Sequence, residues 1–315
     1  MKNILYLVVP CYNEEEVLKD TAEKLKNKYA QLIEQGAIDK RSRIMFVNDG
    51  SKDSTLEIMK ELHQQDKLFS YVNLSRNRGH QNALLAGLYV AAEYADMTIS
   101  IDADLQDDIN AIDKMVEEYQ KGSEIVYGVR SSRKKDTFFK RVTAEGFYKV
   151  MKKMGVETVF NHADFRLMSK KAVQGLMQFE EVNLYLRGIV PQIGYKTSVV
   201  EYERGKRLAG ESKYPLKKML KLAFEGITSF STKPLGMIVS FSLFLLFVSF
   251  CSTVTTAILF GLSIVPVWPL LISVMGLFTG IITLCVGIVG QYVGKNYLET
   301  KHRPRFIVDE VVNDD

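Results

Sequence analysis

Cysteine is scarce in this chain, and the scarcity excludes two classes of protein. Only Cys11, Cys251 and Cys285 occur among 315 residues, and none stands at the spacing of a metal-ligand pair. Disulfide-rich secreted domains and structural zinc sites both need more cysteines, at shorter spacing along the sequence. A reducing compartment is therefore the expected environment.

The N-terminus lacks the pattern of a secretion signal. It reads MKNILYLVVPCYNEEE, in which a single lysine and a short apolar run are followed at once by acids. A signal peptide would need a basic start, an apolar centre and a small-residue cleavage site. The apolar run predicts a buried first strand instead.

Charge is absent from residue 234 to residue 294, although the whole chain is 25% charged with a net charge of +4. Because about 20 apolar residues cross a hydrocarbon core as a helix, this stretch predicts two membrane spans, at about residues 235–259 and 268–293. Lysines and arginines on both flanks predict that both chain ends face the cytoplasm. A buried hairpin in a globular core is the less favoured alternative.

Four segments follow from this division of the chain. Residues 213–233 carry apolar residues at helical spacing with lysines between them, which predicts an amphipathic helix at the membrane surface. A helix packed on the soluble domain is the alternative. Residues 1–212 are expected to form a cytosolic domain, residues 234–294 the two spans, and residues 295–315 a cytosolic tail.

Short apolar runs alternate with polar helical stretches over the first 130 residues. The runs ILYLVVP, RIMFVND, FSYVNL, MTISIDAD and IVYGVR predict strands, and such alternation predicts an α/β fold: a mostly parallel sheet with helices on both faces. Ligands bind beyond the carboxyl ends of the strands in such sheets. Polar clusters stand at four of these ends, at residues 10–14, 48–51 and 102–104 and at Arg130.

Two glycine-rich phosphate cradles are missing. The first strand is not followed by GxGxxG, and GxxxxGK[ST] occurs nowhere. These absences count against a dinucleotide oxidoreductase and a P-loop NTPase.

Acids gather instead at the end of the fourth strand, in TISIDADLQDD. Mg²⁺ and Mn²⁺ bind through one or two carboxylates together with substrate phosphates. Asp104 and Gln106 are candidates to face such a metal. Asp102 is expected either to reach the metal through water or to accept hydrogen bonds from a ribose. An isolated Asp-x-Asp more often forms a turn or a helix cap, so the rest of the chain has to decide.

Six segments, in order, resemble the family 2 glycosyltransferases of the GT-A fold: VVPCYNEEE, VNDGSKDST, LSRNRGHQNALLAG, DADLQDD, DFRLMS and RLAGESKYPLKKMLKLAFEGITSFS. The subgroup is that of the polyprenyl-phosphate glycosyltransferases, relatives of dolichyl-phosphate mannose synthase and the bactoprenol glucosyltransferases. The resemblance covers nearly the whole chain, and it implies a homo-oligomer in a bacterial cell membrane. It also implies inverting transfer of one sugar, from a UDP-hexose or UDP-N-acetylhexosamine, to undecaprenyl phosphate with Mg²⁺ or Mn²⁺.

The resemblance also implies roles for individual residues. Asp104, Asp164 and Arg166 are expected at the catalytic centre, and the metal set is Asp102, Asp104 and Gln106. The nucleotide-sugar is expected to meet Pro10, Tyr12, Glu14, Asp49, Asp102, Arg130, Arg207, Ser212 and Lys213.

Asp164 is expected to orient the acceptor or the sugar more than to remove a proton. A phosphomonoester, whose second pKa is near 6, is mostly ionised at neutral pH. A cationic side chain or the metal should offset the repulsion between Asp164 and that acceptor, and the candidate side chains are Arg130, Arg133, Lys134 and Lys135.

One departure from the family pattern is visible. Relatives often read DADLQHPP, whereas Asp107 and Asp108 stand here. These acids either tune metal binding or cap the next helix, and capping is favoured. His63, His80, His162 and His302 show no metal spacing, and structural or surface roles are favoured for them. Contact with a phosphate is the alternative for His80, which follows Gly79 at a helix start.

Three rival functions stay open at this point. The first is a GDP-mannose-dependent polyprenyl-phosphate mannosyltransferase, and the second is a synthase that glycosylates a lipid or a protein. The third, from another class, is a membrane-anchored nucleotide-binding scaffold without activity.

Overall fold

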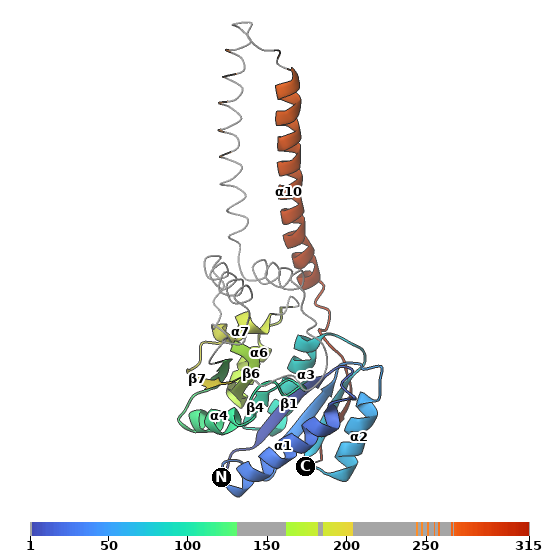
Figure 1. The fold of residues 1–315 in the computed structure, drawn as a ribbon, viewed down its shortest axis with the longest axis vertical. Coiled ribbons are helices and arrows are strands. Elements are labelled where there is room, and N and C mark those ends of the chain that lie inside the picture. Colours follow the sequence, from blue (N-terminus) through green and yellow to red (C-terminus); the bar gives the residue numbers. More distant parts are fainter. Residues whose placement is uncertain are drawn as a thin grey trace.

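The computed structural model of the chain describes residues 2–130, 162–181, 185–203 and 268–314, with a few isolated positions between 244 and 266. The described part is built on one mixed sheet of eight strands in the order β7-β5-β6-β4-β1-β2-β3-β8 (Figure 1). The α/β architecture with helices on both faces is therefore confirmed.

The first half of the sheet is parallel. β1 lies between β2 and β4, and β2 pairs with β3 on its other side. All seven residues of β1 are buried, as expected for a central strand of a parallel sheet. This half comprises β1 (Leu5–Cys11), α1 (Leu18–Glu34), β2 (Arg43–Asn48), α2 (Thr55–Gln65), β3 (Phe69–Leu74), α3 (His80–Tyr94) and β4 (Met97–Ser100).

The second half contains one reversed strand. β6 runs antiparallel to both of its neighbours, β4 and β5, while β7 runs parallel to β5 at the sheet edge. Its elements are α4 (Ala111–Gln120), β5 (Ile125–Arg130), β6 (His162–Ser169), α6 (Lys170–Met177), α7 (Leu186–Gln192) and β7 (Thr197–Tyr202).

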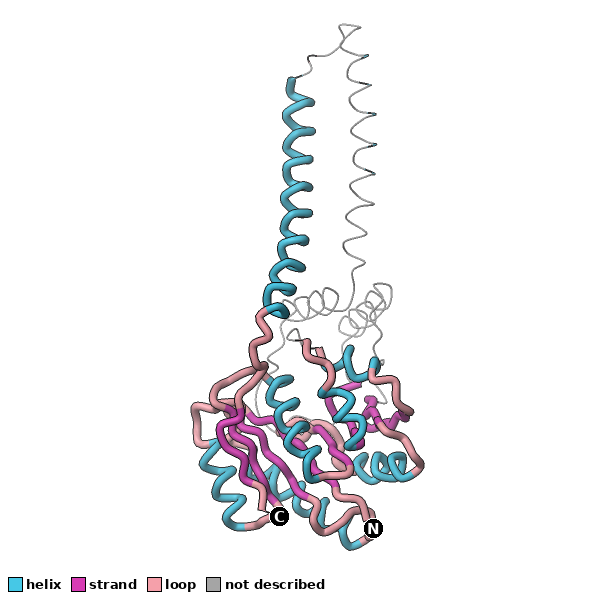
Figure 2. Tube along the Cα trace, turned by 180° about the vertical axis from the view of Figure 1, so that it is seen from behind, coloured by secondary structure: helices cyan, strands magenta, loops and turns pink. Residues whose placement is uncertain are grey.

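The core lies in two layers, one on each face of the sheet. Successive side chains of a strand point to opposite faces, so Leu5, Leu7 and Val9 pack with α1, α2 and α4. Tyr6 and Val8 pack on the other face with α3, α6 and α7. Figure 2 shows the sheet and the helices that flank it from behind.

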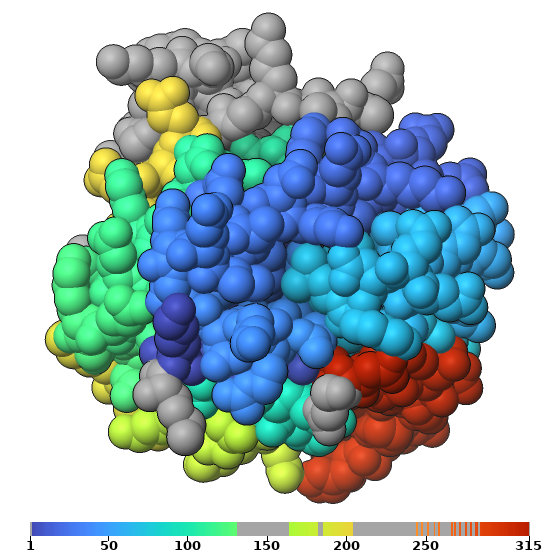
Figure 3. Space-filling view, turned by 90° about the horizontal axis from the view of Figure 1, so that it is seen from below, coloured from blue at the N-terminus to red at the C-terminus, as the bar shows by residue number. Residues whose placement is uncertain are grey.

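The C-terminal segment adds the last strand of the sheet. α10 (Trp268–Thr300) extends away from the α/β domain, and the chain then returns to place β8 (Val308–Val312) antiparallel to β3 (Figure 1). In Figure 3 these C-terminal residues, in red, lie against the light blue segment that contains α2. Residues 295–314, which belong to the segment predicted as a cytosolic tail, end α10 and complete the edge of the domain.

The prediction of two membrane spans is contradicted. Residues 213–233 and nearly all of the first span, 235–259, lie outside the described residues, and the second span falls on α10. Throughout the part of the chain that is described, no helix combines the length and the apolarity needed to cross a membrane.

The expected location in a bacterial cell membrane, with two spans and cytoplasmic ends, is therefore wrong. That prediction rested on an uncharged stretch with enough apolar residues for two helical crossings.

Candidate functional site

The reversed direction of β6 brings Asp164 to the carboxyl end of β4. Met97 pairs with Ser169 and Ser100 pairs with Arg166. If this antiparallel register is continued two residues further, Asp102 lies opposite Asp164. Two acids separated by more than sixty residues in the sequence therefore meet at the edge where parallel sheets bind ligands.

Asp164 is held by two arginines. Arg166 Nη2 donates to its Oδ1 at 2.7 Å, and Arg187 Nη2, from the first turn of α7, donates to its Oδ2 at 3.2 Å. Burial by itself would raise the pKa of Asp164, but Arg187 and Arg166, followed by His80, hold that pKa far below its usual range. Asp164 is therefore a permanent carboxylate at neutral pH.

Arg166 lies almost wholly inside the protein, with only 2% of its surface exposed. Among the described residues, its Nε and Nη1 have no hydrogen-bond partner, and Asp164 is the acid that it contacts. A buried guanidinium without a paired acid would be costly, so the pair acts as one unit.

Arg187 is a site residue that the sequence did not identify, and a site role for His80 was only the less favoured alternative. His80 begins α3, and its Nε2 lies 3.5 Å from Asp102 Oδ1 and 3.8 Å from Asp164 Oδ2. The sequence favoured a structural or surface role for this histidine, and it offered no signal for Arg187 in LYLRG. Their positions depend on how α3 and α7 pack, which motif spacing does not reveal.

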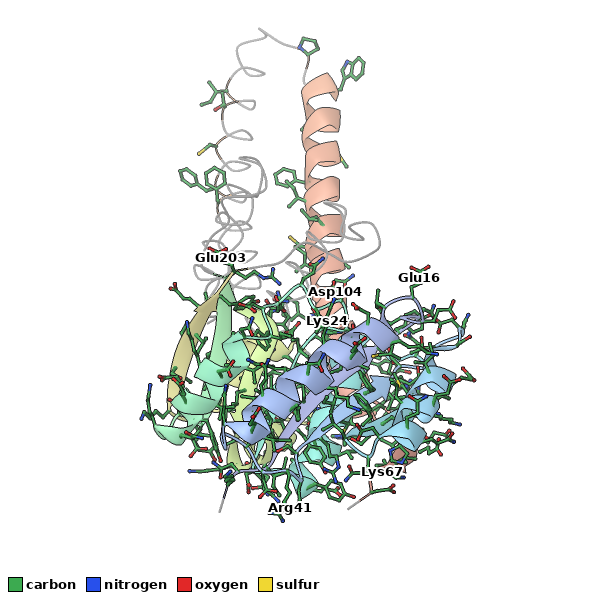
Figure 4. The ribbon with its side chains drawn as sticks, turned by 60° about the horizontal axis from the view of Figure 1, so that its bottom comes forward. Glu16, Lys24, Arg41, Lys67, Asp104 and Glu203 are labelled. Atoms are coloured by element: carbon green, nitrogen blue, oxygen red, sulfur yellow. The ribbon has the colours of Figure 1, made fainter. Side chains whose placement is uncertain are left out.

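Asp102 and Asp104 offer oxygen ligands of the kind that Mg²⁺ and Mn²⁺ use. Figure 4 places Asp104 at the same end of the domain as Glu203, opposite Arg41 and Lys67. The Asp102 side chain is half exposed. Gln106 is 8% exposed, and its backbone N–H donates to Asp104 Oδ1 at 3.2 Å.

This donor set fits a cation that is shared with substrate phosphates. In the described parts of the chain, no three His, Cys, Asp or Glu side chains gather as a ligand set. Mg²⁺ needs only one or two protein carboxylates when phosphates complete its coordination.

Asp107 does not cap the next helix. It is 3% exposed, it accepts a hydrogen bond from Tyr202 Oη at 2.5 Å, and it lies 3.5 Å from Arg130 Nη2. Asp108 Oδ1 accepts from the backbone N–H of Asn110 at 3.0 Å, in the turn that precedes α4, and Asn110 is the N-cap residue of that helix. Neither acid therefore caps α4, and Asp107 ties the acidic segment to β5 and β7.

The expected nucleotide edge lies at the ends of β1 and β2. Asp49 accepts the backbone N–H groups of Arg78 at 2.6 Å and Gly79 at 2.9 Å, so it anchors the loop before α3. Burial raises the pKa of Asp49 against the opposing effect of these two hydrogen bonds. Tyr12, whose surface is 41% exposed, follows β1 at the same edge.

The predicted site residues therefore divide into four groups, of which Pro10, Tyr12, Glu14 and Asp49 lie at the ends of β1 and β2. Asp102, Asp164 and Arg166 form one cluster, with Asp104 and Gln106 beyond Asp102 on the same segment. Arg130 is engaged by Asp107. Outside the described residues lie Arg133, Lys134, Lys135, Arg207, Ser212 and Lys213.

Comparison with known proteins supplies the family. Residues 6–177, more than half of the chain, match the family model described as "Glycosyl transferase family 2". An uncharacterised glycosyltransferase of Bacillus subtilis (strain 168), YkoT, is 46% identical over 97% of this chain and 91% of its own length.

A second relative has a named acceptor. The bactoprenol glucosyl transferase of Shigella phage SfV is 39% identical over 96% of this chain and 97% of its own length. Among solved structures, mannosyl-3-phosphoglycerate synthase from Rubrobacter xylanophilus aligns at 14% identity with a TM-score of 0.47, covering 71% of each chain. That structural likeness is too weak to support an argument.

Proposed function

The chain belongs to glycosyl transferase family 2, and on that premise we propose that it transfers one sugar, with inversion, from a nucleotide-sugar to a polyprenyl phosphate. The donor proposed is a UDP-hexose or a UDP-N-acetylhexosamine. The observation that carries the proposal is the meeting of Asp102, Asp164, Arg187 and His80 at the carboxyl edge of the sheet. The α/β architecture fits the GT-A fold that the sequence motifs imply.

The choice of acceptor is supported by relatives over nearly the full chain. Proteins named bactoprenol glucosyl transferase, from Shigella phages SfV and SfX, are 39% and 38% identical over 96% of this chain. The choice of UDP has no residue-level support, so a GDP-mannose donor is the rival to be tested. A homo-oligomer stays a prediction.

The proposed reaction is a single displacement. An oxygen of the acceptor phosphate attacks the anomeric carbon, and the bond from that carbon to the donor's diphosphate breaks. The nucleoside diphosphate leaves with the bonding electrons. Because the second pKa of a phosphomonoester is near 6, the nucleophile is already ionised at neutral pH and needs no strong base.

The role proposed for Asp164 is orientation. Its pKa lies far below the usual range because of Arg187 and Arg166, so it would be a poor proton acceptor at neutral pH. A carboxylate held by two arginines, with His80 between it and Asp102, is instead a rigid arrangement of charge. Preorganised charge of this kind stabilises a transition state without the cost of reorganisation.

Asp102 and Asp104, with Gln106 beside them, would hold the divalent cation. When bound, Mg²⁺ or Mn²⁺ would stabilise the negative charge that grows on the departing diphosphate. Pro10, Tyr12, Glu14 and Asp49 are proposed to line the nucleoside side of the site, with Arg207, Ser212 and Lys213 on the phosphate side. Arg130 is proposed to reach phosphate while Asp107 holds its guanidinium.

The test measures release of nucleoside diphosphate by the purified protein. The reactions contain undecaprenyl phosphate, Mg²⁺ or Mn²⁺, and a panel of UDP- and GDP-sugars. Asp104→Asn and Asp164→Asn are each expected to reduce kcat by about a hundredfold or more, the usual effect of removing a group that stabilises developing charge. Asp108→Asn is the matched control, because this acid lies on the same segment and its Oδ1 is engaged by the backbone N–H of Asn110.

Two results would change the conclusion. Turnover with GDP-mannose and no UDP-sugar would replace the proposed donor. Nucleotide binding without turnover of any donor on any polyprenyl phosphate would favour a nucleotide-binding scaffold over an enzyme.

A further inference from the structure

A β-bulge lies where the C-terminal strand meets β3. Asn73 pairs with Glu310, whereas the next residue, Leu74, pairs with Val308. Asp309 is the extra residue between these pairs. Bulges redirect a side chain, and they are common beside active sites. In this case the Asp309 carboxylate accepts a hydrogen bond from Asn73 Nδ2 at 3.1 Å.

From Asp309 a series of hydrogen bonds runs toward the end of β1. Asn48 Nδ2 donates to Asn73 Oδ1 at 2.7 Å, and the backbone N–H of Ser51 donates to Asn48 Oδ1 at 3.1 Å. Ser51 Oγ then accepts the backbone N–H of Asn13 at 3.1 Å. The series ends between Tyr12 and Glu14, two residues proposed to meet the nucleotide.

The carboxylate sets the direction of the whole series. An ionised aspartate only accepts hydrogen bonds, whereas an asparagine side chain has one donor end and one acceptor end. Asn73 must turn its NH₂ group to Asp309 and therefore presents its oxygen to Asn48. Asn48, only 2% exposed, is thereby left with its own oxygen toward Ser51.

The loop at the far end of the series has an unusual conformation. Asn13 has a φ of 54°, in the left-handed region that non-glycine residues seldom adopt. Its Oδ1 also accepts the backbone N–H of Lys52 at 2.9 Å. The loop after β1 is therefore held by its contacts with residues 51 and 52, whose own loop is anchored through Asn48.

The segment between α10 and β8 holds the bulge in register. Arg305 Nη1 donates to Tyr89 Oη at 3.2 Å, and the Phe306 and Tyr89 rings lie 6.0 Å apart. The backbone N–H of Ser75 donates to the carbonyl of Ile307 at 3.1 Å. These contacts with α3 and the end of β3 fix where β8 begins.

We infer that Asp309 is a positioning residue for the nucleotide site: through Asn73 and Asn48 it orients the loops that end β1 and β2. The inference rests on the proposed function, because it assumes that these loops bind the nucleoside diphosphate. Asp309 acts through other residues and touches no substrate.

The test compares three substitutions at this position. Asp309→Asn keeps an oxygen that can accept from Asn73, Asp309→Ala removes it, and Asp309→Lys offers only donors and opposes the direction of the series. Glu310→Ala is the matched control on the same strand, because Glu310 pairs with Lys60 at 3.8 Å. UDP affinity is measured by titration calorimetry on the full chain, with thermal unfolding measured in parallel.

The expected result is graded. Asp309→Ala should weaken UDP binding about three- to tenfold, the usual contribution of one hydrogen bond. Asp309→Lys should weaken it further, and Asp309→Asn should stay close to wild type. The KM for the donor should rise in parallel, with kcat unchanged at saturation.

Other outcomes would overturn the inference in distinguishable ways. If Asp309→Ala lowers the unfolding temperature as Glu310→Ala does and leaves UDP affinity unchanged, Asp309 has only a structural role. If the wild type binds neither UDP nor GDP, the proposed function fails and this inference fails with it.

Discussion

At the scale of single residues, the site is defined by how charges are paired. Asp164 contacts Arg166 and Arg187, and Asp102 lies near His80. The sequence predicted that a cation would stand beside Asp164, and two arginines do. It named Arg130 and three residues outside the described part as candidates, whereas Arg187 comes from a helix with no recognised motif.

The low pKa of Asp164 predicts how stability depends on pH. A carboxyl group whose folded pKa is depressed contributes stability that is fully present above its unfolded pKa, about 3.9. That stability is lost as the pH falls through the folded pKa. The difference in unfolding free energy between wild type and Asp164→Asn should therefore be constant from pH 5 to pH 8 and shrink below about pH 4.

Urea unfolding of both proteins across this pH range is the measurement, with His80→Gln in each so that the imidazole 3.8 Å from Asp164 does not contribute. A difference that still changes between pH 6 and pH 8 would mean that Asp164 titrates near neutrality, which would restore it as a candidate general base.

Asp107 predicts a measurable coupling with Tyr202. Asp107→Ala removes the acid that the Tyr202 hydroxyl and the Arg130 guanidinium share, and a buried hydrogen bond to a charged group contributes about 1.5–3 kcal/mol. In a double-mutant cycle with Tyr202→Phe, we expect a coupling energy of about 0.5–3 kcal/mol. Asp108→Ala with Tyr202→Phe is the control cycle, in which additive effects are expected.

At the scale of elements, α3 lies unusually close to the sheet. A Cβ added at Gly87 would come within 2.4 Å of Val8 Cγ1 and 2.5 Å of Val47 Cγ2. The glycine therefore lets the helix approach β1 and β2, and His80 begins this same helix. The position of His80 thus depends on a packing contact two helical turns away.

Gly87→Ala should destabilise the protein by about 1–3 kcal/mol, because the added methyl group overpacks a dense interface. Gly290→Ala is the matched control, since no atom of the described residues lies within 4 Å of a Cβ at that position of α10. There the change should be neutral or stabilising by about 1 kcal/mol, the difference in helix propensity. Denaturant midpoints measure both, and equal effects would contradict the packing argument.

At the scale of the whole molecule, the two ends of the chain stabilise one sheet. Tyr6 Oη donates to Asn313 Oδ1 at 3.2 Å, and Arg43 Nη2 donates to the carbonyl of Asp314 at 3.4 Å. The residues that follow α10 therefore belong to the same α/β domain as β1 and β2. The C-terminal residues are part of its hydrogen-bonded structure.

Removal of residues 308–315 should lower the unfolding temperature and promote aggregation. The deletion exposes the edge of β3, and an unpaired edge strand invites pairing with another chain. Glu310→Gln, which keeps β8 intact, is the control and should behave as wild type. Thermal unfolding with light scattering measures both effects, and an unchanged transition in the deletion would show that β8 is dispensable.

The sequence by itself determined the five strands from β1 to β5 and the edge at which the polar clusters gather. These properties follow from local periodicity and from residue types at strand ends, so neighbouring residues suffice to predict them. The same motifs identified the family.

Only the tertiary structure decided which distant residues meet. The reversed direction of β6 places Asp164 opposite Asp102, and the packing of α7 and α3 brings Arg187 and His80 to them. Asp107 turns inward to Tyr202, and β8 closes the edge beside β3. Each of these contacts depends on strand register and helix packing, which are set by the combined burial of many side chains and not by any single segment.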